Sequence, residues 1–180
     1  MLRPCARIFV CATYPTILLV LGGTGKTGSE LVKQGLERGH EVTALVRSPH
    51  KIKTEDGRLT IIQGNPLEEQ TLIRALTGQD AVLSTLGHPD LKESFIVTEG
   101  AKALIAAMNV SNVTRLMIIS STLVSPGGSF LTKIPRYLTR HPLNDSAEME
   151  KVVEQASVDW CGSRTRLQDL IGYLRMNPRR

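Results

Sequence analysis

A run of closely spaced glycines is the strongest chemical signal in the sequence. Gly22, Gly25 and Gly28 have G-x-x-G-x-x-G spacing within the stretch Gly22-Gly23-Thr24-Gly25-Lys26-Thr27-Gly28. Such glycines permit a tight turn, let the backbone approach a pyrophosphate, and let a helix pack closely on a strand. A helix that begins at this turn adds free N–H groups and a positive dipole end. We therefore interpret the turn as a dinucleotide phosphate site; the alternative is a tight strand–helix turn without a ligand.

The same residues also imitate the end of a P-loop. Gly25-Lys26-Thr27 matches the last part of G-x-x-x-x-G-K-[ST], but the first glycine of that motif would have to stand at position 20, where the chain has Val20. The loop is too short to wrap a triphosphate in the P-loop manner. A nucleoside triphosphatase or kinase is not expected.

The residue that follows the second apolar run indicates which dinucleotide is preferred. NAD-binding domains typically have Asp or Glu there, which accepts a hydrogen bond from the ribose 2′-hydroxyl. This chain has Arg47 and then Ser48. A guanidinium pairs bidentately with a 2′-phosphate, and Lys26 could add a second positive contact. The sequence thus favours NADP(H) over NAD(H), unless Arg47 is only a solvated loop charge.

Short apolar runs alternate with helical patterns along most of the chain. Strands are expected at 17–21, 41–46, 59–62, 81–87, 115–119 and 158–161, and helices at 26–38, 66–76, about 93–108, and 144–155. We expect residues 125–143 to be mostly loop. This alternation predicts an α/β fold, a Rossmann-type doubly wound parallel sheet in a single domain, with ligands outside the carboxyl ends of the strands. The expected divisions are an N-terminal extension over 1–15, the domain over 16–170 and a basic tail over 171–180.

The composition excludes several other classes. The net charge of +5 is dispersed and aromatic residues make up 4%, so no nucleic-acid partner is expected. No apolar stretch approaches the ~20 residues of a membrane-spanning helix. Three cysteines without CxxC spacing predict neither disulfides nor a metal site, and favour the reducing cytoplasm. The basic N-terminus, with no acid before Glu30, leaves organelle targeting open.

The order of several motifs resembles the atypical short-chain dehydrogenases/reductases. More narrowly, it resembles their NAD(P)H-binding group, which includes NmrA-like proteins and the flavin reductase/biliverdin-IXβ reductase type. The likeness spans about residues 17–169 and rests on the glycine turn, Leu45-Val46-Arg47, Gly78-Gln79-Asp80-Ala81-Val82, Leu86-Gly87 and Ser120-Ser121.

The resemblance implies a role for each matching position. The pyrophosphate would lie on Gly22, Thr24, Gly25, Lys26, Thr27 and Gly28, and the 2′-phosphate on Arg47 and Ser48. Asn65 would lie near the adenine, and Leu86 and Gly87 beside the nicotinamide ribose. Ser121 matches a serine near the nicotinamide in the reductase branch, which makes it the candidate catalytic residue.

Two departures from the family pattern bear on activity. The Tyr-x-x-x-Lys pair of classical members is absent, since Tyr137 is followed four residues later by His141. Arg164-Thr165 stands where relatives have Arg-Pro, and the chain ends soon afterwards. We therefore expect a fold shortened on its C-terminal side.

The leading functional hypothesis is an NADPH-dependent oxidoreductase that passes hydride to a flavin, quinone or similar flat acceptor. This chemistry requires mainly that the two rings be held face to face, so the missing Tyr-Lys pair is no objection. A non-catalytic NADP(H) sensor of NmrA-like type that reports to a protein partner comes second. An NAD(P)-dependent epimerase/dehydratase-like enzyme comes third. Further acid–base candidates are His88, His141 and Glu150, although a loop histidine such as His88 is more often simply solvated.

Overall fold

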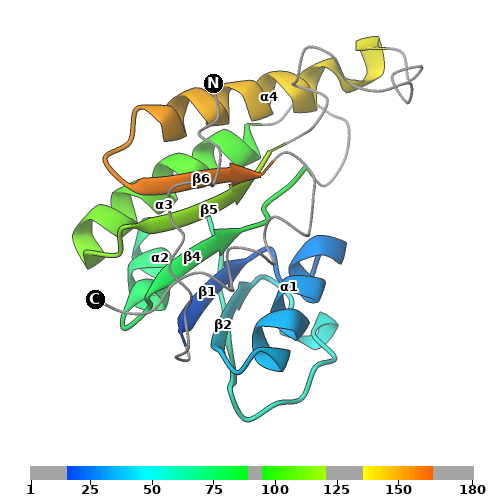
Figure 1. Ribbon diagram of the computed structural model, residues 1–180. Helices are drawn as coiled ribbons and strands as arrows, with labels where there is room; N and C mark the ends of the chain where they lie inside the picture. Colours follow the sequence, from blue (N-terminus) through cyan, green and yellow to red (C-terminus); the bar gives the residue numbers. More distant parts are fainter. Residues whose placement is uncertain (1–15, 89–94, 121–135, 164–180) are drawn as a thin grey trace.

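A computed structural model describes residues 16–88, 95–120 and 136–163 (Figure 1). Strands and helices alternate throughout these ranges. In chain order they are β1 (Ile17–Leu21), α1 (Lys26–Glu37), β2 (Glu41–Val46), the short 3-10 helix η2 (Pro49–Lys51), β3 (Leu59–Gln63), α2 (Glu69–Leu76), β4 (Ala81–Ser84), α3 (Ile96–Ser111), β5 (Arg115–Ile119), α4 (Arg136–Glu154) and β6 (Asp159–Ser163). The expected N-terminal extension, the tail over 171–180 and Ser121 lie outside the described residues.

The described strands form one sheet, in the order β3-β2-β1-β4-β5-β6, and all its pairs are parallel. β1 lies between β2 and β4, with Leu19 opposite both Thr43 and Val82. This order is that of the doubly wound dinucleotide-binding fold, so the predicted fold class is confirmed. The chain reverses its direction across the sheet between β1 and β4. The carboxyl ends of these two strands therefore border the crevice where such folds bind ligands.

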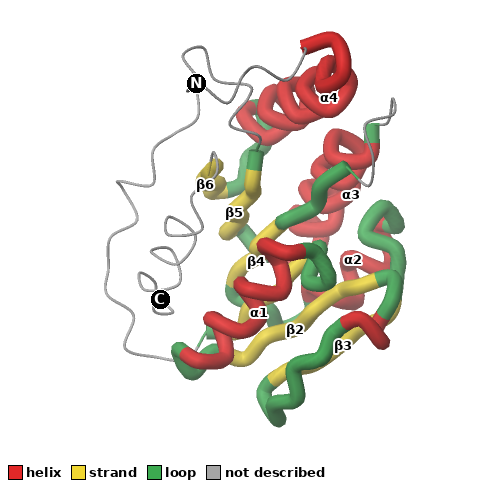
Figure 2. Tube along the Cα trace, turned by 90° about the vertical axis from the view of Figure 1, so that its right-hand side faces the viewer, coloured by secondary structure: helices red, strands yellow, loops and turns green. Residues whose placement is uncertain are grey.

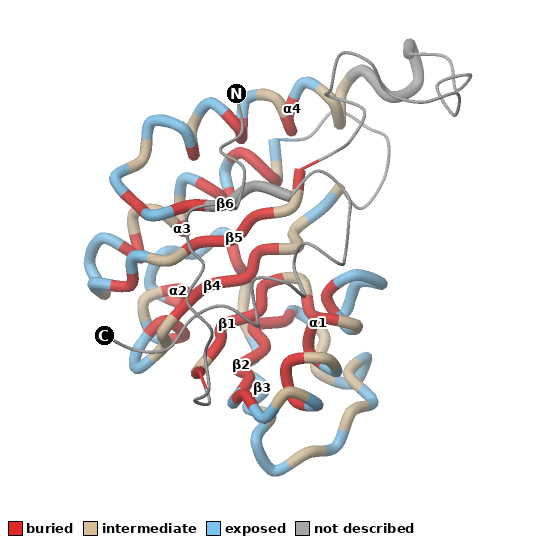
Figure 3. Tube along the Cα trace, viewed as in Figure 1, coloured by how far each residue is buried: buried red, intermediate tan, exposed pale blue. Residues whose placement is uncertain are grey.

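Helices cover both faces of this sheet (Figures 1 and 2). Alternate residues of β1 serve the two sides: Leu18 and Val20 pack in the cluster that contains α1, and Leu19 and Leu21 pack in the cluster that contains α2, α3 and α4. Figure 3 shows the central strands β1, β2, β4 and β5 buried almost along their whole length, whereas the edge strand β3 is partly exposed. Parallel strands covered on both faces read as continuous apolar runs, which explains why the sequence predicted β1, β2 and β5 with their observed bounds.

The largest correction concerns the fourth helix, which begins at Arg136 rather than at 144 and contains Pro142. Proline lacks a backbone N–H and usually ends a helix, so the sequence pattern placed the start after it. The hydroxyl of Ser146 donates a 2.8 Å hydrogen bond to the Pro142 carbonyl. Further along α4, Met149 and Val153 are fully buried in the core. Tertiary packing thus holds a helix that local propensity would interrupt.

Other expected bounds also shift. The fourth strand ends at Ser84 instead of Gly87, since no residue beyond Ser84 is paired with β1 or β5. The second helix begins at Glu69 after a turn, and the third extends to Ser111. Within residues 16–88, 95–120 and 136–163, no helix has the length and apolar character needed to cross a bilayer, and no cluster of three or more His, Cys, Asp or Glu could hold a metal ion.

Candidate nucleotide-binding site

The glycine turn connects the end of β1 to the N-terminus of α1. Gly22 has a φ of 79°, a left-handed conformation that glycine adopts without steric cost. The backbone N–H of Gly25 donates to the Gly22 carbonyl at 2.9 Å, which closes the turn. Gly25 is also the N-cap of α1, and no side chain caps the helix there. The first N–H groups of α1 thus have no side-chain acceptor from the cap residue and are suited to an anion.

Two of the three motif glycines are required by close approach of the backbone. A Cβ on Gly22 would lie 2.8 Å from the Thr85 carbonyl oxygen, and a Cβ on Gly28 would lie 2.1 Å from the Gly22 carbonyl oxygen. A Cβ on Gly25 would meet only the Gly22 oxygen, at 3.3 Å. Gly22 and Gly28 therefore let α1 and β4 close around the turn. This cradle fits a dinucleotide pyrophosphate, as the glycine spacing predicted.

Thr85 locks the turn from the neighbouring strand. Both its backbone N–H and its hydroxyl donate to the Leu21 carbonyl, at 3.0 Å and 2.8 Å. These two hydrogen bonds join the residue after β4 to the end of β1 and fix the two strands relative to each other at the switch point. Thr85 belongs to no recognisable motif in the sequence; its one local signal is a hydroxyl directly before Leu86-Gly87 at the end of an apolar run.

A cavity of about 240 Å³ opens at this edge of the sheet. Six of the predicted cofactor residues line it: Gly22, Thr24, Gly25, Arg47, Leu86 and Gly87. The structure adds their neighbours at the end of β2 and after β4 and one residue from a further segment, namely Leu45, Val46, Thr85, His88 and Pro66. The remaining predicted residues, which do not line it, are Lys26, Thr27, Gly28, Ser48 and Asn65. The motif residues from β1, β2 and β4 are thus brought together around one space.

Arg47 occupies the carboxyl end of β2 and is exposed. No hydrogen bond or ion pair joins its side chain to any other residue in the described part of the chain. Among the described residues that line the cavity there is no carboxylate. Both facts fit a guanidinium that binds an anionic ligand group. They do not favour binding of a ribose 2′-hydroxyl, which needs a hydrogen-bond acceptor on the protein.

Asn65 makes local contacts in the structure. Its side-chain carbonyl accepts a hydrogen bond from the Leu67 backbone N–H at 3.1 Å, and the turn leads into α2. The neighbouring Pro66 lines the cavity instead. A role for Asn65 beside the adenine stays a prediction of the family resemblance.

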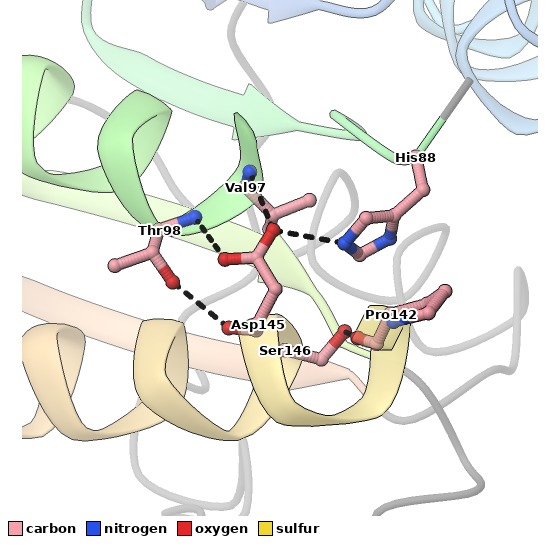
Figure 4. Close-up of polar contacts among 6 residues, drawn as sticks. All are labelled: His88, Val97, Thr98, Pro142, Asp145 and Ser146. Atoms are coloured by element: carbon pink, nitrogen blue, oxygen red, sulfur yellow. Dashed lines mark hydrogen bonds and ion pairs between the residues drawn. The ribbon is translucent and has the colours of Figure 1, made fainter. Parts of the chain in front are cut away.

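His88 is anchored in a polar network rather than solvated, which corrects the simpler expectation for a loop histidine (Figure 4). Its Nε2 lies 2.8 Å from Oδ2 of Asp145, on α4. The same carboxylate accepts hydrogen bonds from the backbone N–H groups of Val97 and Thr98, both at 3.0 Å. Asp145 therefore caps the N-terminus of α3 from a different helix while it holds the imidazole.

A second buried polar pair lies where β5 ends. The hydroxyl of Ser120 donates to Oε1 of Glu150, on α4. Both residues are buried, so Glu150 is part of the packing between α4 and the sheet rather than an open acid–base group. The candidate catalytic Ser121 follows immediately and lies outside the described residues.

The fold and the cavity together define a dinucleotide-binding domain of Rossmann type. The chain belongs to the NAD(P)H-binding family, whose model matches residues 22–165. It is therefore an NAD(P)H-binding domain from an oxidoreductase-type family.

The curated relatives include reductases and assembly factors. The chain is 36% identical over 107 residues to photosystem II assembly factor Ycf39 of Synechocystis, covering 57% of this chain and 33% of the relative. It is 33% identical over 115 residues to isoflavone reductase homolog P3 of Arabidopsis thaliana, covering 59% and 35%. It is 31% identical over 157 residues to a 3-beta-hydroxysteroid dehydrogenase of Mycolicibacterium neoaurum, covering 78% and 42%. The chain thus spans less than half the length of these relatives.

Solved structures show the same fold. The enzyme WbmH of Bordetella bronchiseptica, solved in complex with NAD+, has a TM-score of 0.66 at 18% identity, covering 84% of this chain and 56% of that one. A short-chain dehydrogenase/reductase of Veillonella parvula, solved in complex with NADP, has a TM-score of 0.61 at 16% identity, covering 84% and 69%.

Proposed function

We propose that this chain is an NADPH-dependent reductase domain that passes hydride to a flavin, quinone or similar flat acceptor. Membership of the NAD(P)H-binding family supports the cofactor class, and the relatives that are named reductases support the reaction class. The observation that favours NADPH over NADH is Arg47, exposed beside the cavity with no partner among the described residues.

Each part of the cavity has a role in this proposal. The N–H groups at the start of α1 and the turn at Gly22 and Gly25 would hold the pyrophosphate, and Arg47 would pair with the 2′-phosphate. When bound, the cofactor supplies a hydride from its nicotinamide. The protein's own contribution is orientation, which Thr85 supports by fixing the end of β4 against β1.

The acceptor would lie beyond Leu86 and Gly87. A Cβ added to Gly87 would meet no atom of the described residues within 4 Å, so none of them fills the space beside it. The lining contributes both apolar and polar surface, as a flat conjugated ring requires for stacking and for orientation. Such an acceptor needs no Tyr-Lys pair to be reduced.

The cofactor half of the proposal is tested by titrating the protein with NADPH and NADH, with nicotinamide fluorescence as the readout. Replacing Arg47→Ala is expected to weaken NADPH binding about 10- to 100-fold, because a hydrogen bond to a charged group contributes about 1.5–3 kcal/mol. NADH binding should not change. Arg74→Ala, which removes another exposed arginine on α2, is the matched control. Equal affinity of the wild type for the two nucleotides would refute the preference.

The acceptor half is tested by following NADPH oxidation at 340 nm with a panel of flavins and quinones. Turnover of at least one flat acceptor, with none for small aliphatic ketones, is the expected outcome. Reduction of ketones alone would contradict the proposal, because the preferred acceptor would then not be a flat conjugated ring.

One comparison favours a second candidate, a non-catalytic NADP(H)-binding domain that engages a protein partner. Ycf39 of Synechocystis is named an assembly factor, and this chain lacks the Tyr-x-x-x-Lys pair. The two candidates differ in one measurement: the second requires tight NADPH binding without oxidation by any acceptor of the panel.

A further inference from the structure

The one histidine on the cavity wall is tied to a buried aspartate from a distant helix. His88 lines the cavity directly after Leu86 and Gly87, and its side chain is 12% exposed. Asp145 lies 57 positions later in the sequence, and its side chain is 1% exposed. We propose that His88 donates the proton that accompanies hydride transfer to the acceptor, with Asp145 as its positioning residue. This inference rests on the reductase function proposed above.

Asp145 is held so firmly that it fixes the imidazole in turn. Its Oδ1 accepts from the Thr98 N–H and its Oδ2 from the Val97 N–H, each at 3.0 Å. The Thr98 hydroxyl also donates to the Asp145 backbone carbonyl at 2.9 Å. Figure 4 shows the carboxylate between the N-terminus of α3 and the imidazole of His88. A carboxylate with these contacts cannot turn away without uncapping α3.

The geometry assigns different tasks to the two ring nitrogens. An ionised carboxylate only accepts hydrogen bonds, so the ring nitrogen that faces it, Nε2, carries a proton whether His88 is neutral or charged. The proton that His88 can transfer to a substrate is therefore the one on Nδ1. Nδ1 bonds to no residue in the part of the chain that the structure describes. The imidazole thus keeps one nitrogen for a substrate, oriented by a carboxylate on the other, as in histidines that act as acid–base groups.

The proposed step balances with a quinone as acceptor. Conversion of a quinone to a hydroquinone takes one hydride, which carries both electrons from NADPH, and one proton. The N–H bond at Nδ1 of the charged imidazole breaks, and an O–H bond forms on the quinone oxygen. His88 becomes neutral, keeps its Nε2–H bond to Asp145, and regains a proton from water, to which its side chain is 12% exposed. Among the described residues, Asp145 is the charged group that contacts His88, and Arg47 is the charged residue that lines the cavity.

A glutamine substitution separates proton transfer from a purely structural bond. The side-chain amide of Gln can donate to Asp145 from a position close to that of Nε2, but it cannot release a proton. His88→Gln is expected to lower kcat for quinone reduction about 10²-fold or more, the usual contribution of general acid catalysis. The Kd for NADPH and the KM for the quinone should stay within about threefold. Added imidazole should restore part of the kcat of His88→Ala. His50→Gln, at an exposed histidine on η2, is the matched control.

A second measurement uses the free protein and needs no turnover. Long-range ¹H–¹⁵N NMR spectra should show neutral His88 as the Nε2–H tautomer, and Asp145→Asn should abolish this preference. Unchanged kcat in His88→Gln would overturn the inference and leave His88 as a structural bond. A tenfold loss of NADPH affinity with unchanged kcat would overturn it too, because His88 would then be a cofactor ligand. If the wild type binds NADPH but reduces no acceptor, the reductase proposal itself has failed. This outcome is seen in the wild type alone, so it is distinct from any result with the His88 variants.

Discussion

Adding a single methyl group at Gly28 tests the packing that creates the nucleotide site. The new Cβ would lie 2.1 Å from the Gly22 carbonyl oxygen and 2.7 Å from the Thr85 hydroxyl oxygen. Contacts of a Cβ with backbone below 3.0 Å essentially never occur, so α1 must move away from the turn by about 0.9 Å. Alanine in the first turn of α1 would by itself favour the helix by up to about 1 kcal/mol. Overpacking typically costs about 1–3 kcal/mol, and more where backbone must shift.

We expect the steric cost to win, and Gly28→Ala to lower the free energy of unfolding by about 2 kcal/mol. For a domain of this size that corresponds to a fall in Tm of about 4–8 °C. Because the shift opens the phosphate cradle, NADPH affinity should fall at least tenfold. Differential scanning calorimetry and NADPH titration measure the two effects.

The matched control is Gly57→Ala, where an added Cβ meets nothing within 4 Å. It should leave NADPH affinity unchanged and alter Tm little or raise it slightly, since alanine reduces the entropy of the unfolded chain. If Gly28→Ala were as stable as Gly57→Ala and bound NADPH like the wild type, the close approach of α1 to the turn would be refuted.

Two further predictions concern the polar contacts outside the turn. Asp145→Asn should lower the free energy of unfolding, measured by urea denaturation, by about 2–3 kcal/mol. The reason is that an amide cannot accept from both N–H groups of α3 and from His88. Asn144→Ala, at the exposed neighbour, should cost little. A different pair is expected to respond to acid: the Arg58 guanidinium and backbone N–H donate to Asp56 and lower the pKa of that carboxyl below its ordinary value of 3.8. Since the pKa is lowered in the folded state, the stabilisation is present above 3.8 and is lost as the pH falls through the lowered pKa. Asp56→Asn should therefore unfold at a slightly lower urea concentration than the wild type at pH 7, by a small amount because the pair is solvent-exposed. The difference should shrink as the pH falls below 3.8 and through the lowered pKa. A difference that grew toward pH 2 would contradict the assigned sign.

The helix bounds show where local patterns were insufficient. The predicted start of α4 was wrong because Pro142 signals a break in the sequence pattern. A single sequence does not reveal that Met149 and Val153 will anchor the helix to the core. The predicted end of β4 was also wrong, because there the local pattern continues past the last residue of the strand. Thr85 continues the strand-like pattern and still bonds to the Leu21 carbonyl, but no residue beyond Ser84 is paired with β1 or β5.

The sequence by itself determined the class of fold and the phosphate turn. Both follow from local rules: apolar runs of strand length, helical periodicity, and glycines at positions that a backbone approach requires. Gly22 and Gly28 are needed because of atoms only a few positions away or on the adjoining strand. Arg47 could be singled out because the residue after the second strand always borders the cofactor crevice in this fold.

Only the tertiary structure decided how the acceptor side of the cavity is built. His88 meets Asp145 across 57 positions, and Thr85 meets Leu21 across 64. Neither contact can be predicted from a spacing in the sequence. The first depends on how α4 packs on α3, and the second on which strands become neighbours at the switch point. The side chains that orient a reacting group are thus set by packing between distant segments. The glycine spacing, in contrast, is visible within one segment, although Thr85 supplies some of the atoms that require Gly22 and Gly28.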